Sequence, residues 1–171
     1  SLDANTTGSN NSAFGREALT KTTTGGNNTG LGFESLKENT TASDNTAVGY
    51  QSLKLNTTGT NNTGLGYQAG DSLTTGAGNT FVGKESGDGV TTGSDNICIG
   101  RNVTLATAST SNGISIGIGI NAAANDFSFG KASNVVTNDF DTDEDWSRSS
   151  DVRLKRNIKD IKDHICYGVE T

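Results

Sequence analysis

The densest group of side chains that can bind a metal ion is an acidic run of five carboxylates just before Trp146. The carboxylates are Asp139, Asp141, Asp143, Glu144 and Asp145. Aspartates at alternate positions match the first three ligands of an EF-hand calcium loop. The sixth loop position, where glycine is needed, is Trp146, and the twelfth, where glutamate is needed, is Val152. The run therefore favours a solvated acidic linker over a calcium site, and we expect no metal or cofactor.

Other reactive residue types are too sparse to build a multi-turnover active site. His164 is the only histidine, which excludes a histidine-based triad or a histidine-rich metal site within one chain. Cys98 and Cys166 lie in different kinds of sequence, which favours one buried and one incidental thiol over a disulfide. No Gly-Lys-Ser/Thr follows the glycine-rich stretches, so they predict no phosphate-binding loop.

The elements that position these residues are defined by a repeat of seventeen residues. One asparagine, one apolar residue and one glycine recur at this interval. The asparagines are Asn11, Asn28, Asn45, Asn62, Asn79 and Asn96; the apolar residues are Phe14, Leu31, Val48, Leu65, Val82, Ile99 and Ile116; the glycines are Gly15, Gly32, Gly49, Gly66, Gly83, Gly100 and Gly117. This regularity predicts a solenoid, in which every repeat forms one turn of the same shape.

Each repeat predicts a rung of two short strands and two turns. Thr46, Val48 and Tyr50 alternate with small residues and would share one face of a strand. Gly49 permits a positive φ or a close backbone approach, and residues 57–62 predict a turn into the next strand. Rungs stacked about 4.8 Å apart would form parallel ladders in which identical residues lie above one another.

The end of the repeat region is its most apolar part. Residues 102–125 carry no charge, and isoleucines alternate with serine and glycine at Ile114, Ile116, Ile118 and Ile120. This pattern predicts a strand with one fully buried face. A shortened repeat follows at 127–130. The expected fold is therefore an all-β parallel β-roll or β-helix of about seven rungs over residues 1–130, an acidic linker or tip over 131–148, and a short α-helix within 149–171.

Composition and charge exclude several classes of protein. Apolar residues make up 30% of the chain, against roughly 45–50% in globular domains, so one chain buries a thin core and we expect partner chains to share it. The net charge of −6 argues against nucleic-acid binding, which needs a basic stripe. No apolar run approaches the roughly 20 residues of a membrane span. The chain begins at Ser1 rather than methionine, so we expect a fragment or a processed product.

The repeats carry a first resemblance. Asn-Thr-Ala-Val-Gly-Tyr-Gln-Ser-Leu (45–53) and Asn-Thr-Gly-Leu-Gly-Tyr-Gln-Ala-Gly (62–70) resemble the head repeats of trimeric autotransporter adhesins, and are closer still to repeats of phage tail-fibre proteins. In those families such repeats build parallel β-rolls or β-helices that pack as trimers. The resemblance implies a homotrimer. It is specific for architecture and weak for ligand.

The segment after residue 148 has a helical pattern. An N-cap is available at Ser149, Ser150 or Asp151. Apolar residues then recur at spacings of four, three and four, at Leu154, Ile158, Ile161 and Ile165. This pattern is typical of a coiled-coil seam, although it is too short to specify the number of strands. A simple coiled-coil stalk is therefore one interpretation of the segment.

A second resemblance gives the same segment a chemical role. Ser-Asp-Val-Arg-Leu-Lys-Arg-Asn-Ile (150–158) resembles the start of the endosialidase-type intramolecular chaperone domain, which ends many phage tail spikes and fibres. In that family the domain assembles the trimer and then cuts itself off. The resemblance implies a catalytic dyad of Ser150 and Lys155, with cleavage at Ser149, Ser150 or Asp151. The family's domain continues well beyond the end of this chain, so we expect incomplete machinery here.

The implied chemistry is a single-turnover autoproteolysis. A serine hydroxyl is a poor nucleophile until a base takes its proton. Lysine acts as that base only when burial or nearby positive charge lowers its pKa, and Arg153 and Arg156 supply such charge. Trimer closure would bury Lys155, so that cleavage would report correct assembly.

The expected function is structural and adhesive: a viral tail fibre or tail spike component that holds a receptor-binding surface away from the virion. Expected partners are two further copies of the chain, a host-cell surface receptor, for which a glycan is the candidate, and other virion fibre or tail proteins. We expect assembly in the host cytoplasm, and no nucleic acid or membrane insertion. Trp146 is the candidate receptor-binding residue.

Two other interpretations remain open. The head of a bacterial trimeric adhesin would share the repeats but would leave residues 150–158 unexplained. An ice-binding solenoid is suggested by the rows of threonine, but it needs a flat Thr-x-Thr face, whereas these threonines fall mainly in predicted turns.

Overall fold

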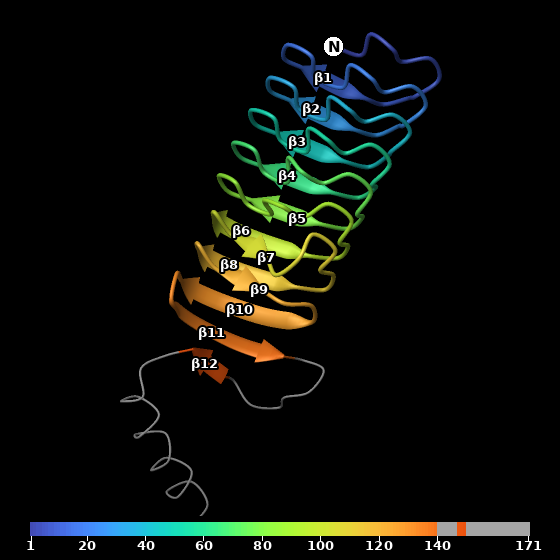
Figure 1. Cartoon of the computed structure of the whole chain (residues 1–171). Helices are drawn as coiled ribbons and strands as arrows, with labels where there is room; N and C mark the ends of the chain where they lie inside the picture. Colours follow the sequence, from blue (N-terminus) through green and yellow to red (C-terminus); the bar gives the residue numbers. More distant parts are fainter. Residues whose placement is uncertain (140–146, 150–171) are drawn as a thin grey trace, which may run out of the picture.

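The chain folds as a parallel β-solenoid. The computed structural model describes residues 1–139 and 147–149, and in these ranges the rungs stack one behind another along a single axis (Figure 1). The main sheet has ten strands in the order β1-β2-β3-β4-β5-β6-β8-β10-β11-β12. The predicted fold class, an all-β solenoid of about seven rungs with a seventeen-residue repeat, is confirmed. The predicted C-terminal helix lies outside the described residues.

The strands of the main sheet are short and keep the register of the repeat. Five have three residues: β1 Ser12–Phe14, β2 Thr29–Leu31, β3 Thr46–Val48, β4 Thr63–Leu65 and β5 Thr80–Val82. Two have five residues: β6 Ile97–Arg101 and β8 Ile114–Ile118. Each of the strands β1 to β6 pairs in parallel with the strand seventeen residues later, as Thr29 does with Thr46. The next step is shorter, because Phe127 of β10 pairs with Ile114, and this matches the predicted shortened repeat.

The prediction of two strands per rung is wrong for the first five rungs. Their second half is a series of turns, because residues such as Glu34 (φ 54°) and Leu36 (φ 49°) adopt left-handed conformations that interrupt extended backbone. Among the described residues, a second sheet forms between β7 Thr104–Leu105 and β9 Asn121–Ala122, near the C-terminal end of the stack.

At its C-terminal end the main sheet changes from parallel to antiparallel pairing. β10 (Asp126–Lys131) pairs antiparallel with β11 (Asn134–Asp139), and β11 pairs antiparallel with β12 (Ser147–Ser149). A tight turn that includes Ala132 (φ 48°) reverses the chain. These strands occupy part of the segment for which the sequence indicates a linker, and they end the parallel ladder that would otherwise continue.

The buried asparagines hold consecutive rungs together. The backbone N–H of Asn45 donates to Oδ1 of Asn28 over 3.0 Å, and Nδ2 of Asn45 donates to the carbonyl of Gly59 over 2.9 Å. The same pattern recurs at Asn28, Asn62, Asn79 and Asn96. Because buried backbone groups need partners, this role explains why asparagine recurs at every seventeenth position.

The glycine row lets the rungs approach closely. Gly49 has a φ of 137°, and a Cβ at this position would lie 2.2 Å from the carbonyl oxygen of Gly66. The same close contact recurs between Gly66 and Gly83. Any side chain here would meet backbone that cannot move without breaking the stack, so the repeat admits only glycine.

One aromatic residue in the core is matched by two glycines. Leucines fill the interior at Leu19, Leu36 and Leu53, but the next equivalent positions are Gly70 and Gly87. The ring of Phe81 occupies that space: a Cβ added to either glycine would lie 2.3 Å from a ring atom. On the strands of the preceding rungs, the position equivalent to Phe81 is occupied by smaller residues, Gly64 and Ala47. The core therefore stays filled in every rung, because the large side chain comes from the turns in the earlier rungs and from the strand at Phe81.

This exchange predicts compensation between two substitutions. We expect Phe81→Gly to destabilise the fold by about 3–5 kcal/mol through a cavity, and Gly70→Leu alone to cost about 1–3 kcal/mol through overpacking. The double variant should recover at least about 2 kcal/mol of the summed loss, because the introduced leucine would restore the arrangement of the earlier rungs. Urea unfolding followed by circular dichroism measures this. Strictly additive losses would contradict the exchange.

Candidate functional site

The outward side of the main sheet carries a continuous row of apolar side chains, which we call the apolar ladder. It consists of Phe14, Leu31, Val48, Leu65, Val82, Ile99, Ile116 and Phe129. The strand register places each member over the next. Leu31 is 43% exposed, Leu65 46% and Ile116 37%, although each has neighbours in the stack.

The prediction that the isoleucine face of residues 114–120 is fully buried is therefore wrong for most of that face. Ser115 is buried, whereas Ile116 and Ile118 are exposed and only Ile120 enters the core. The interior is narrow, and the leucines and asparagines of the turns already fill it. Only small residues fit at the centre of most strands, as at Ala47 and Gly64. The larger apolar residues that follow them, Val48 and Leu65, must therefore face outward.

The apolar ladder widens toward the C-terminal end of the sheet. The outward row beside it is polar in β1 to β5, at Ser12, Thr29, Thr46, Thr63 and Thr80. It becomes apolar in β6, β8 and β10, at Ile97, Ile114 and Phe127. Strand spacing gives the ladder a length of roughly 35 Å. An apolar row that stays partly exposed from β1 to β10 is a candidate contact surface.

An aromatic row follows the other side of the apolar ladder. The rings of Phe33, Tyr50 and Tyr67 stack with centroids 5.2 and 5.1 Å apart. Arg16 lies 5.7 Å from the Phe33 centroid at one end, and Lys84 lies 5.7 Å from the Tyr67 centroid at the other. These stacks fix the orientation of the rings, so the row forms a firm border to the apolar ladder.

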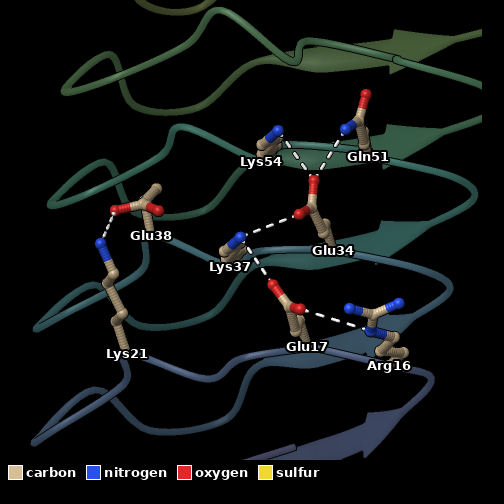
Figure 2. Close-up of polar contacts among 8 residues, drawn as sticks. All are labelled: Arg16, Glu17, Lys21, Glu34, Lys37, Glu38, Gln51 and Lys54. Carbon is tan, nitrogen blue, oxygen red and sulfur yellow. Dashed lines mark hydrogen bonds and ion pairs between the residues drawn. The ribbon is translucent and has the colours of Figure 1, made fainter.

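An ion network ties the first three rungs together on the turn side (Figure 2). The Glu34 carboxylate accepts hydrogen bonds from Lys37 over 2.8 Å and from Gln51 over 2.7 Å, and lies 2.7 Å from Nζ of Lys54. Lys37 also contacts Glu17 over 2.6 Å. Hydrogen bonds from Lys37, Lys54 and Gln51 lower the pKa of Glu34 to about 2. The partners come from three different rungs, so the network fixes their relative positions.

The row that contains Lys37 and Lys54 continues with Asp71 and Asp88. Burial raises the pKa of the Asp71 carboxyl, and the negative charge of Asp88 in the next rung adds to the shift. Stacking thus places like charges over one another here as in the first rungs, where Lys37 and Lys54 share one row and Glu17 and Glu34 share another; in the first rungs the two rows form ion pairs with each other.

The ion network predicts a loss of stability in acid. The pKa of Glu34 is lowered from 4.5 in the unfolded chain to about 2 in the folded one. Its contribution is therefore present above pH 4.5 and is lost as the pH falls from 4.5 toward 2. We expect Glu34→Gln to lower the urea midpoint at pH 7 and to reduce the further drop between about pH 5 and pH 3. Glu85→Gln, at the equivalent position of a later rung where the carboxylate forms an ion pair with Lys84, is the matched control. Equal effects of the two variants would contradict a special role for Glu34.

Most residues for which the sequence predicts chemistry lie outside the described ranges. These are Ser150, Asp151, Lys155 and Trp146, together with the acidic run after Asp139. Ser149 ends β12, where its backbone is paired opposite Val135. Cys98 is a buried free thiol, as predicted, and burial raises its pKa to about 12; Cys166 is not among the described residues. Within residues 1–139, no cluster of histidine, cysteine or carboxylate side chains is suited to a metal ion.

The apolar ladder is the feature that sequence reasoning missed. Its signal is present in the sequence: the residue before each ladder position is usually small, at Ala13, Gly30, Ala47 and Gly64. A strand that buries its small residues must present its larger ones outward, but the repeat alone does not say which face is inside.

Comparison with protein-family models, with curated proteins and with solved structures finds no match. The described part of the chain contains no helix long and apolar enough to cross a membrane. The fold by itself defines the class: a repeat protein of the parallel β-solenoid type.

Proposed function

We propose that the chain is a shaft segment of a homotrimeric fibre and that the apolar ladder forms the contacts between its three chains. The observation that carries the proposal is the exposed apolar row that runs the whole length of a rod-like stack. Its even spacing suits a second row of the same spacing better than an irregular partner, and identical chains supply such a row. The resemblance of the repeats to trimeric fibre and adhesin repeats supports the same arrangement.

The widening of the apolar ladder supports firm association at the C-terminal end. There two outward rows are apolar, including Ile97, Ile99 and Phe129, so contact between chains would remove more apolar surface per rung than at the N-terminal end. The biological role that follows is that of a viral tail fibre or tail spike component for attachment to a host-cell receptor. The alternative is the head of a bacterial trimeric adhesin, which would use the same interface.

The proposed interface predicts a change in assembly for two lysine substitutions. We expect the full chain to sediment as a trimer and the Leu31→Lys/Leu65→Lys variant to sediment as a folded monomer, a threefold lower mass, because six charges would lie in the apolar contact. The control is Thr41→Lys/Thr58→Lys, which adds equal charge at exposed turn positions and should remain trimeric. A monomeric parent, or a trimeric Leu31→Lys/Leu65→Lys variant, would overturn the proposal.

The resemblance of residues 150–158 also leads us to propose self-cleavage beside Ser150, with Lys155 as the base. We expect the full-length gene product to lose its C-terminal mass, and the Ser150→Ala and Lys155→Ala variants to keep it, as measured by intact mass under denaturing conditions. Ser149→Ala is the neighbouring control and should be processed. Normal processing of Ser150→Ala would contradict the dyad. If the parent is not cleaved, the coiled-coil stalk is the better interpretation of residues 150–171, and the adhesin head becomes the favoured function.

A further inference from the structure

Two rows of mostly exposed residues border the main sheet on its opposite sides. On one side, the aromatic row continues with Lys84, Arg101 and Ile118. On the other side, a row lies at the corner that precedes each strand, and we call it the corner row. Its members are Asn10, Asn27, Asp44, Asn61, Gly78, Asp95 and Asn112. Each of these rungs therefore presents a corner residue before its strand and a member of the opposite row after it.

The rung of β6 carries opposite charges at its two borders. Arg101 ends β6 and, by alternation, lies on the same face as Ile97 and Ile99. Asp95 lies just before the strand, in the corner row. Both side chains are exposed, and neither forms an ion pair with another described residue, whereas Lys84 in the rung before is paired with Glu85.

The Asp95 carboxylate differs from the other side chains of its row. Nδ2 of Asn10 donates to Oδ1 of Asn27 over 3.1 Å, and Nδ2 of Asn27 donates to Oδ1 of Asp44 over 3.0 Å. In contrast, Oδ1 of Asp95 lies over Gly78, where an added Cβ would be 2.3 Å from it. No side chain in the described part of the chain donates to this carboxylate, so it is available to a donor from outside the chain.

Asp95 and Arg101 cannot pair with each other within one chain. They stand at the two ends of an extended strand, β6, and six residues of extended chain span roughly 20 Å. This separation is far beyond the reach of an ion pair. Only a second copy of the chain can bring an aspartate of this row beside an arginine of the opposite row.

A rotation axis parallel to the stack produces this arrangement. When identical chains pack the faces of their sheets around such an axis, the corner row of each chain lies beside the aromatic row of the next. Equivalent rungs stay at the same height, so Arg101 of one chain lies beside Asp95 of its neighbour. An antiparallel face-to-face pair would instead place the aromatic row against itself, and Arg101 would then meet no carboxylate of the corner row.

The apolar ladder alone does not fix how the chains are aligned. Its steps are nearly equal, so a second ladder shifted by one rung, roughly 4.8 Å, would fit almost as well. Charge distinguishes the two alignments. A shift of one rung would leave Asp95 beside either Ile118 or Lys84, and the Lys84 ammonium is already held by Glu85 and lies 5.7 Å from the centroid of the Tyr67 ring.

We propose that Arg101 of one chain and Asp95 of the next form an ion pair that fixes the parallel orientation and the register of the assembled chains. The pair lies beside the widest part of the apolar ladder, at Ile97 and Ile99, and so at the rim of the apolar contact, where charged groups are tolerated. The inference rests on the proposed packing through the apolar ladder and adds the residues that decide its alignment.

The test exchanges the two charges. We expect Asp95→Arg and Arg101→Asp each to raise the midpoint concentration of assembly at least about tenfold in sedimentation experiments at low salt, because each sets like charges beside one another. The double variant should return to within about threefold of the parent, because the pair is restored with its charges exchanged. The defect of the single variants should shrink in about 1 M sodium chloride, which screens exposed charges. An unchanged circular dichroism spectrum establishes that each variant is folded.

The matched control is Asp88→Arg, which makes the same change of charge at an exposed residue on the turn side and should assemble like the parent. Unchanged assembly of either single variant, or a double variant no better than the single ones, would overturn the ion pair and leave the trimer in place. A monomeric parent would overturn both proposals. A dimeric parent with rescue in the double variant would overturn the trimer alone, since the same pair forms around any axis parallel to the stack.

Disulfide formation measures the register directly while the ion pair stays intact. In a Cys166→Ser background, Asn61→Cys/Tyr67→Cys places thiols on the two borders of one rung, and we expect it to link neighbouring chains under mild oxidation, as seen on a denaturing gel. Asn61→Cys/Tyr50→Cys is offset by one rung and should link at least about tenfold more slowly, because disulfide geometry is strict. Equal linking of the two pairs, or faster linking of the offset pair, would contradict the proposed register.

Discussion

The constraint on which the rest of the structure depends is the fixed spacing between rungs. Parallel pairing holds neighbouring strands about 4.8 Å apart, and each residue therefore lies against the residue seventeen positions away. The glycine row makes this spacing possible, because the backbone of Gly49 approaches that of Gly66 more closely than any side chain would allow. The other features of the repeat follow from this constraint, because each side chain must fit beside the equivalent side chain of the next rung.

Different residue types meet this spacing constraint in different ways. Asparagine stacks on asparagine because an amide is both donor and acceptor, so each rung satisfies the next. Stacked charges of one sign repel, so a repeated charge needs an opposite charge beside it. In the first rungs, the row of Glu17 and Glu34 lies beside the row of Lys37 and Lys54, and Lys37 contacts both glutamates. Further along, burial raises the pKa of Asp71, and the negative charge of Asp88 adds to the shift. The row that begins with Glu17 and Glu34 continues with the neutral Gln51 and Gln68, and Nε2 of Gln68 donates to Oε1 of Gln51 over 3.0 Å.

The same constraint leaves the protein with a thin core and an apolar exterior. A seventeen-residue circuit encloses little space, which Leu36, Leu53 and Phe81 fill, and the remaining apolar side chains line up outside. An exposed row of this kind is costly to keep in water, and identical spacing makes a second copy of the row a well-matched cover. The self-association that we propose through the face of the sheet would follow from this geometry.

The seventeen-residue period by itself determined the parallel solenoid, the register of its strands, the asparagine and glycine rows and the shortened last repeat, because the interval between equivalent residues is a direct record of the rung length. It did not determine which face of each strand lies inside. Thr46-Ala47-Val48 alternates equally well in either orientation, and a reader of the sequence assigns the larger apolar residue to the core. Only the tertiary structure decided that Ala47 faces inward and Val48 outward, because the width of the interior is set by Leu36 and Leu53 on the opposite wall. The change to antiparallel pairing at the C-terminal end was also beyond the sequence pattern, since β11 pairs through contacts that no repeat encodes. The ion network needed the fold as well, because Glu17, Lys37 and Lys54 meet only when their rungs are stacked.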